Sequence, residues 1–120
     1  YVLKAPPEGL AALASVIGQV KSIIKVPFGV NYLWDPVATV ALAVATEASF
    51  AREIFTGVYA SDMGLWAPDC AGAARLRASQ GRADLQMLLN INAEFATSLG
   101  TRALAVKDKS AVFSSKAGVV

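Results

Sequence analysis

The sequence contains no histidine and only one cysteine, and these two absences exclude whole classes of function. Without histidine, this chain alone cannot form a Ser-His-Asp relay or a metal site that depends on imidazole ligands. Cys70 has no second cysteine with which to form a disulfide within the chain. The sequence therefore favours a reducing compartment, and we expect a cytoplasmic protein. Cys70 stands just inside a predicted helix start, where helix packing is a commoner role than reactivity.

Charged side chains are also scarce, at 17% of the 120 residues. The eleven basic and nine acidic residues are mixed along the chain, and no Lys/Arg cluster follows a helix face. This distribution argues against a nucleic-acid partner. The longest uncharged stretch with helical character, "PVATVALAVAT", has eleven residues, whereas a membrane-spanning helix needs roughly 20. We therefore expect no membrane span.

The common motifs for nucleotides and metals are missing as well. There is no G-x-x-x-x-G-K-[ST] and no G-x-G-x-x-G, which counts against the standard nucleotide-binding loops. Glu53, Asp62 and Glu94 carry oxygen atoms that suit a hard cation, but their spacing matches no known metal-binding loop. The sequence specifies no cofactor, and we predict no metal site.

Apolar residues, in contrast, are abundant. They make up 55% of the sequence, more than is usual for an independent domain of this size. The chain begins with Tyr1 rather than Met and ends in the apolar run "KAGVV". We expect residues 1–120 to be a single partial domain of a longer protein, because surfaces covered by the rest of that protein would then be counted here.

The hydrophobic period switches repeatedly between the helical and the strand repeat. Helices are predicted at residues 6–23, 34–48, 68–79 and 101–116, and strands at 24–31, 49–57, 84–92 and from 117 onward. Strands that alternate with helices form parallel βα units with right-handed connections. The sequence therefore predicts an α/β fold with a parallel sheet.

The strand "DLQMLLNIN" favours a closed barrel over an open doubly wound sheet. Its odd-numbered residues are apolar, whereas its even-numbered residues include Gln86, Asn90 and Asn92. A central strand of a doubly wound sheet is apolar on both faces. A strand of a (β/α) barrel turns one face inward, where polar groups collect at the C-terminal mouth. Asn90, Asn92 and Glu94 fit this second pattern.

The segment "GVYASDMGLWAP" (residues 57–68) comes after the second predicted strand. Its apolar residues repeat with neither a helical nor a strand period. It spans about ten residues, where roughly two to six would suffice for a βα connection. Three interpretations of this loop are open: an Ω-like loop packed by its own aromatic residues, a loop that covers a ligand, or a contact between subunits. The side chains of this loop that could contact a ligand or a partner are Tyr59, Asp62 and Trp66.

Further candidate site residues follow the other predicted strands. They are Asn31 after the first strand, Glu53 and Thr56 on the second, and Asn90, Asn92 and Glu94 on the third. Asp35 is better explained as a helix cap than as a ligand group. Arg52 and Glu53 are neighbours in a strand and should face opposite sides, so only one of them can face the interior. The other would need a partner among the helices, and we favour Glu53 as the functional residue.

Three stretches, "VPFGVNYLWDPVATVALAVAT", "FAREIFTGVYASDMGLW" and "NINAEFATSLG", give the chain its resemblance to the BtpA/SgcQ family. The most specific part is "FTGVYASDMG", supported by "PFGVN" and "KSAVFSS". Members of this family are (β/α)8 barrels of roughly twice this length. The resemblance implies that this chain covers about the third to fifth strands and the start of the sixth. "NINAEF" is similar to the SgcQ-like branch, since the BtpA-like branch carries histidines at about that point.

Two functions remain open. The resemblance and the polar strand ends favour an enzyme, or an enzyme-like binder, of a small polar metabolite such as a phosphorylated sugar or nucleoside. Glu94 or Glu53 would act as general base, and Asn90 and Asn92 would orient hydroxyl groups. The further substrate-binding candidates are Asn31, Thr56 and Asp62. The usual phosphate site of such barrels, after the seventh and eighth strands, lies outside this chain.

The alternative is a non-catalytic assembly or stabilising factor for a membrane protein complex. The family takes its name from members implicated in building up photosystem I, although other members occur in organisms without photosynthesis. In this interpretation Trp34, Tyr59 and Trp66 would be exposed anchors at a protein interface. Unpaired edges of a partial sheet would also tend to associate, so a homo-oligomer is a further possible partner.

Overall fold

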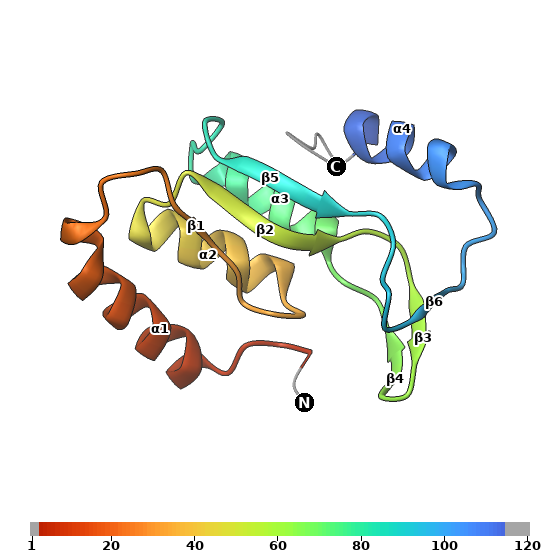
Figure 1. Ribbon diagram of the computed structural model, residues 1–120, viewed down its shortest axis with the longest axis horizontal. Helices are drawn as coiled ribbons and strands as arrows, with labels where there is room; N and C mark the ends of the chain where they lie inside the picture. Colours follow the sequence, from red (N-terminus) through yellow and green to blue (C-terminus); the bar gives the residue numbers. More distant parts are fainter. Residues whose placement is uncertain (1–2, 115–120) are drawn as a thin grey trace.

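Residues 3–114 are described by a computed structural model, which is a mixed α/β fold built on a three-stranded parallel sheet (Figure 1). The strand order is β1 (Gly29–Val30), β2 (Phe50–Phe55) and β5 (Gln86–Asn90), and both pairs are parallel. The predicted parallel sheet is thus confirmed. The strand predicted from residue 117 onward lies outside the described residues.

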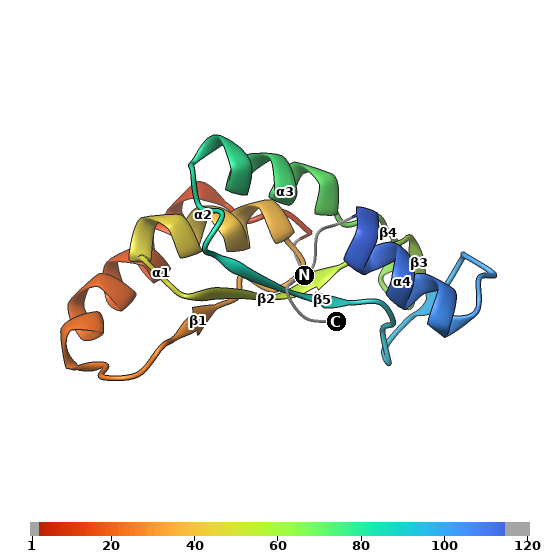
Figure 2. The same cartoon turned by 90° about the horizontal axis from the view of Figure 1, so that it is seen from above.

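Four α-helices accompany this sheet in the described part of the chain. They are α1 (Pro7–Val20), α2 (Pro36–Thr46), α3 (Cys70–Ser79) and α4 (Leu104–Ser114), all within the predicted helical segments. Figure 2 shows α2 and α3 on the same side of the sheet, and within residues 3–114 no helix lies across the opposite face. None of these helices combines the length and the hydropathy needed to cross a membrane.

The helix α2 forms the centre of the core, where it packs against α1, α3 and β2. Asp35 caps it as predicted, because its Oδ1 atom accepts a hydrogen bond from the Ala38 N–H at 2.9 Å. Pro36 occupies the first turn, where a missing N–H costs nothing. The buried Thr39 hydroxyl accepts from the Tyr32 N–H at 3.0 Å and lies 2.8 Å from the Asp35 carbonyl. These bonds fix the loop between β1 and α2.

The sheet presents one apolar face to the helices and one mixed face away from them. Leu85, Met87 and Leu89 are buried in the core with α2 and α3, while Gln86 is exposed and Asn90 is half-buried. This alternation agrees with the predicted pattern for β5. Each large apolar side chain buried here stabilises the fold by about 1.5–3 kcal/mol. The polar face is left for other contacts.

Residues 57–68 contain two strands that the predicted loop lacked, although Tyr59 and Trp66 pack on each other, as in the first of the three interpretations. They form a hairpin of β3 (Tyr59–Ser61) and β4 (Gly64–Trp66), and β6 (Thr97–Ser98) pairs with β3 to complete a small antiparallel sheet. Gly64 has a φ of +98°, which the turn requires and which glycine adopts readily. The strands have three residues or fewer, too short for a period to show in the sequence.

The first strand is also shorter than predicted. Only Gly29 and Val30 pair with β2, although the sequence pattern covered residues 24–31. Pro27 has no N–H to donate to a neighbouring strand, so pairing begins after it. The shortening leaves the C-terminal end of β1 where it was predicted, next to Asn31.

We predict that Gly29→Ala destabilises the protein while Gly18→Ala does not. A methyl group on Gly29 would lie 2.0 Å from Cε2 of Phe50, so the strands or the ring must shift, at a cost of about 1–3 kcal/mol. Gly18 lies inside α1 with no atom within 4 Å of an added methyl group, so alanine there should stabilise by about 0.5–1 kcal/mol. Urea denaturation of the full-length protein measures both, and equal effects would contradict the predicted packing.

Candidate functional site

Five aromatic rings gather at the edge of the sheet where β1, β2 and β5 end. Phe55 is the last residue of β2, and the other four rings come from the connections that follow these strands: Trp34, Tyr59, Trp66 and Phe95. Ring centroids are 4.5 Å apart for Trp34 and Phe95, 5.0 Å for Trp34 and Trp66, and 4.8 Å for Phe55 and Trp66. Most pairs meet edge to face, the favourable geometry for such rings. This aromatic cluster joins three separate connections.

The hairpin is attached to the rest of the fold through Tyr59 and Trp66. Their side chains are only 1% and 3% exposed, so the expectation that they are exposed interface anchors was wrong. The Tyr59 hydroxyl donates a hydrogen bond to the Thr56 carbonyl at 2.6 Å, and burial raises the pKa of Tyr59. These rings are structural, since they form a small second core at the base of the hairpin together with Phe55 and Ala93.

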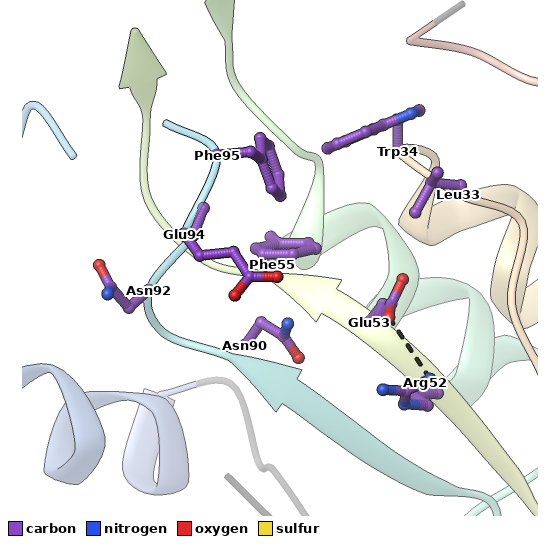
Figure 3. Close-up of a pocket in the computed structure, with 10 residues that line it drawn as sticks. Leu33, Trp34, Arg52, Glu53, Phe55, Asn90, Asn92, Glu94 and Phe95 are labelled. Carbon is purple, nitrogen blue, oxygen red and sulfur yellow. Dashed lines mark ion pairs between the residues drawn. The ribbon is translucent and has the colours of Figure 1, made fainter. Parts of the chain in front are cut away.

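A cavity of about 520 Å³ lies beside the aromatic cluster, at the C-terminal edge of the sheet. Four of the predicted site residues line it: Glu53, Asn90, Asn92 and Glu94 (Figure 3). The rings of Trp34, Phe55 and Phe95 form its apolar side. We call it the carboxylate cavity, since the carboxylates of Glu53 and Glu94 both line it.

Arg52 and Glu53 both line the carboxylate cavity, which contradicts the prediction that only one could face it. The pairing of β2 with β5 shifts register between Ala51 and Ile54, and Glu53 adopts a left-handed φ of 56°. A bulge of this kind adds one residue and interrupts the alternation of side chains. As a result the Arg52 guanidinium and the Glu53 carboxylate lie 3.4 Å apart and form an ion pair.

Asn31, the residue directly after β1, contacts the Glu53 carboxylate. Its Nδ2 atom donates a hydrogen bond to Glu53 Oε2 at 2.8 Å. The Oδ1 atom of the same amide is buried and has no hydrogen-bond partner among residues 3–114. A buried acceptor without a donor costs about 1–3 kcal/mol.

The end of β5 supplies the other polar side chains. In Figure 3 the Glu94 carboxylate extends over Asn90, while the Asn92 amide points away from Glu53. Asn90 also ties β5 to β2, because its carbonyl accepts a hydrogen bond from the Thr56 N–H at 3.1 Å. Carboxylates and amides arranged in this way can accept from and donate to the hydroxyl groups of a polar ligand.

Three predicted residues do not line the carboxylate cavity. Asn31 reaches it only through its hydrogen bond to Glu53. Thr56 lines a different cavity next to α4, and Asp62 is exposed at the hairpin turn, where it shares a third cavity with Glu94. Both carboxylate oxygens of Asp35 already accept hydrogen bonds, Oδ1 from the Ala38 N–H of the helix cap and Oδ2 from the Ala5 N–H at 2.8 Å. Within the part of the chain described, no three His, Cys, Asp or Glu side chains are grouped to hold a metal ion.

The lining residues that the sequence did not predict are Leu33, Trp34, Phe55, Ala93 and Phe95, and Arg52 lines the cavity together with Glu53 rather than in its place. Phe95 carried a usable signal, since it follows directly after Glu94 in a connection at a strand end. Arg52 carried none, because its placement depends on the bulge in β2.

Residues 1–120 match the sequence profile of the BtpA family. The chain belongs to the BtpA family. It is 49% identical over 113 residues to the sgc region protein SgcQ of Escherichia coli (strain K12), an alignment that covers 94% of this chain and 42% of SgcQ. The chain therefore spans less than half the length of this relative. The expected resemblance is confirmed, and no solved structure matches the chain.

We predict that Glu53→Gly leaves the free energy of unfolding within about 1 kcal/mol of the wild type. Glycine relieves a left-handed backbone strain of about 1–2 kcal/mol, and this gain offsets the entropy of glycine and the lost bond to Asn31. Ala51→Gly, two residues earlier in β2 at a buried position, should destabilise by about 1–2 kcal/mol. Chemical denaturation measures the free energy of unfolding of both variants. If Glu53→Gly lowered it as much as Ala51→Gly does, the bulge would not be strained.

Proposed function

We propose that this member of the BtpA family is an enzyme, or an enzyme-like binder, of a small polar metabolite. The substrate class is a phosphorylated sugar or a nucleoside. One observation carries the proposal: two carboxylates, an arginine and two amide side chains line one cavity next to aromatic rings. Ligand sites typically combine an apolar wall with a few convergent polar groups in this way.

In this proposal Glu94 is the general base. Its side chain makes no hydrogen bond and no ion pair within residues 3–114, and Figure 3 shows its carboxylate directed into the cavity. A base must lie within hydrogen-bond reach of the proton that it removes. An unoccupied carboxylate at the cavity mouth can take such a position against a substrate hydroxyl.

Glu53 is the second catalytic candidate, and its contacts suit a different task. One oxygen accepts from Asn31 at 2.8 Å and the other lies 3.4 Å from Arg52. These contacts fix the carboxylate, and each oxygen keeps a lone pair for a ligand hydroxyl. Glu53 therefore orients the substrate, while Glu94 carries out the proton transfer.

The aromatic side of the cavity suits the flat face of a sugar or a nucleobase. Phe95 is 42% exposed and packs edge to face on Trp34, so its ring remains available to a ligand. Asn90 and Asn92 supply both donors and acceptors to hydroxyl groups.

We also infer that the parallel sheet is part of the wall of a (β/α) barrel in the cytoplasm. Successive strands lie in the order β1-β2-β5, and α2 and α3 cover one face only. A barrel has this arrangement, with its site at the C-terminal ends of the strands. In such a barrel this chain provides about the third to fifth strands, and the other strands contribute further groups to the site.

The alternative function, a non-catalytic assembly factor, has lost its structural support. It rested on the family name and on Trp34, Tyr59 and Trp66 as exposed anchors, and two of these three residues are buried.

We expect phosphorylated sugars or nucleosides to stabilise the full-length protein in thermal melts. A ligand at about 100 times its dissociation constant adds roughly 2.7 kcal/mol to the free energy of unfolding. The Glu94→Gln variant should lose this stabilisation and any turnover. Glu8→Gln, the same change at an exposed carboxylate in the first turn of α1 that does not line the carboxylate cavity, should retain both.

The proposal fails if melts stay flat across a broad panel of these compounds. It also fails if a compound stabilises wild-type protein and the Glu94→Gln variant equally, because the ligand would then bind elsewhere.

A further inference from the structure

A second cavity, of about 380 Å³, lies between α4 and the base of the hairpin. Its lining includes two hydroxyl-bearing serines, two glycines and two cations: Ser98, Ser110, Gly57, Gly100, Arg102 and Lys107. No carboxylate is among its lining residues. We call it the basic cavity, to distinguish it from the carboxylate cavity on the other side of the end of β2.

Both cations are held in place by serine hydroxyls. The Lys107 ammonium donates a hydrogen bond to Ser98 Oγ at 3.0 Å, and the Arg102 guanidinium donates to Ser110 Oγ at 3.3 Å. Neither cation forms an ion pair within residues 3–114. An ammonium has three donors and a guanidinium five, so most of their donors remain available. The positive charges of Arg102 and Lys107 line the same cavity and repel each other, and a bound anion offsets this repulsion.

The backbone at the basic cavity is also open to a ligand. Gly57 has a φ of +100° and Gly100 lies in the connection after β6, so neither places a side chain between the cavity and the main chain. The Thr56 side chain adds a third hydroxyl to the lining. Hydroxyls, glycine backbone and unpaired cations are the groups that bind tetrahedral oxyanions.

We propose that the basic cavity binds a phosphate group, either carried by the metabolite or as free phosphate. The inference rests on the proposed function, since it names the part of a phosphorylated substrate that this chain holds. Phe55 lines the carboxylate cavity and the next residue, Thr56, lines the basic cavity. A molecule bound across the end of β2 can therefore present its hydroxyl groups to Glu94 and its phosphate to Arg102 and Lys107.

The first test is calorimetric titration of the full-length protein with inorganic phosphate. Lys107→Gln and Arg102→Gln should each weaken phosphate binding by about tenfold or more, the usual effect of losing a charge-assisted hydrogen bond. Lys109→Gln removes the same charge from an exposed position on α4 that does not line the cavity, and it should leave the dissociation constant within about twofold. Equal weakening by Lys107→Gln and Lys109→Gln, or no weakening by either cavity variant, overturns the proposal.

A second comparison distinguishes the two sources of phosphate. If a sugar phosphate binds more tightly than its unphosphorylated parent and Lys107→Gln removes that difference, the metabolite carries the group. If inorganic phosphate binds through Lys107 but the two sugars bind alike, the site takes free phosphate. In either case Glu94→Gln should retain phosphate binding. If no metabolite binds but phosphate binding still depends on Lys107, the proposed function fails while the basic cavity stands.

Discussion

The packing of five aromatic rings at one edge of the sheet is the interaction on which the rest of this site depends. Strands of two or three residues are marginal by themselves, and the hairpin keeps its place because Tyr59 and Trp66 are buried against Phe55. Each ring pair adds about 0.5–1.5 kcal/mol beyond the area that it buries. Trp34 and Phe95 join the same cluster from two other connections, and together with Phe55 they line the carboxylate cavity. The packing of the rings therefore fixes the aromatic side of that cavity.

The bulge in β2 is the second constraint, and it shows how backbone strain and polar chemistry are linked here. A non-glycine residue at a φ of 56° is unfavourable, and it persists where the surroundings determine it. Pairing with β5 resumes at Ile54, and Asn31 and Arg52 both contact the displaced carboxylate. The strained position thereby gives one short strand two adjacent charged groups on the same face.

The order of helices and parallel strands could be predicted from the sequence, because residues such as Asp35 and Pro36 mark a helix start locally. Glu53, Asn90, Asn92 and Glu94 could be predicted as neighbours for a similar reason: polar residues at the ends of parallel strands share an edge. The hairpin could not, since its strands are too short to show a period. The placement of Arg52 could not either, because nothing in "FAREIF" reports a left-handed φ at glutamate.

The exposed turn of the hairpin has a consequence for how relatives with this fold can diverge. Its anchoring rings lie at the base, while Asp62 and Met63 at the tip are exposed. Exposed loop tips tolerate substitution and insertion far better than packed segments do. Mutations can therefore accumulate at this tip, next to the cavity that Asp62 shares with Glu94, while the core stays intact. Ligand preference and fold stability can then evolve almost independently.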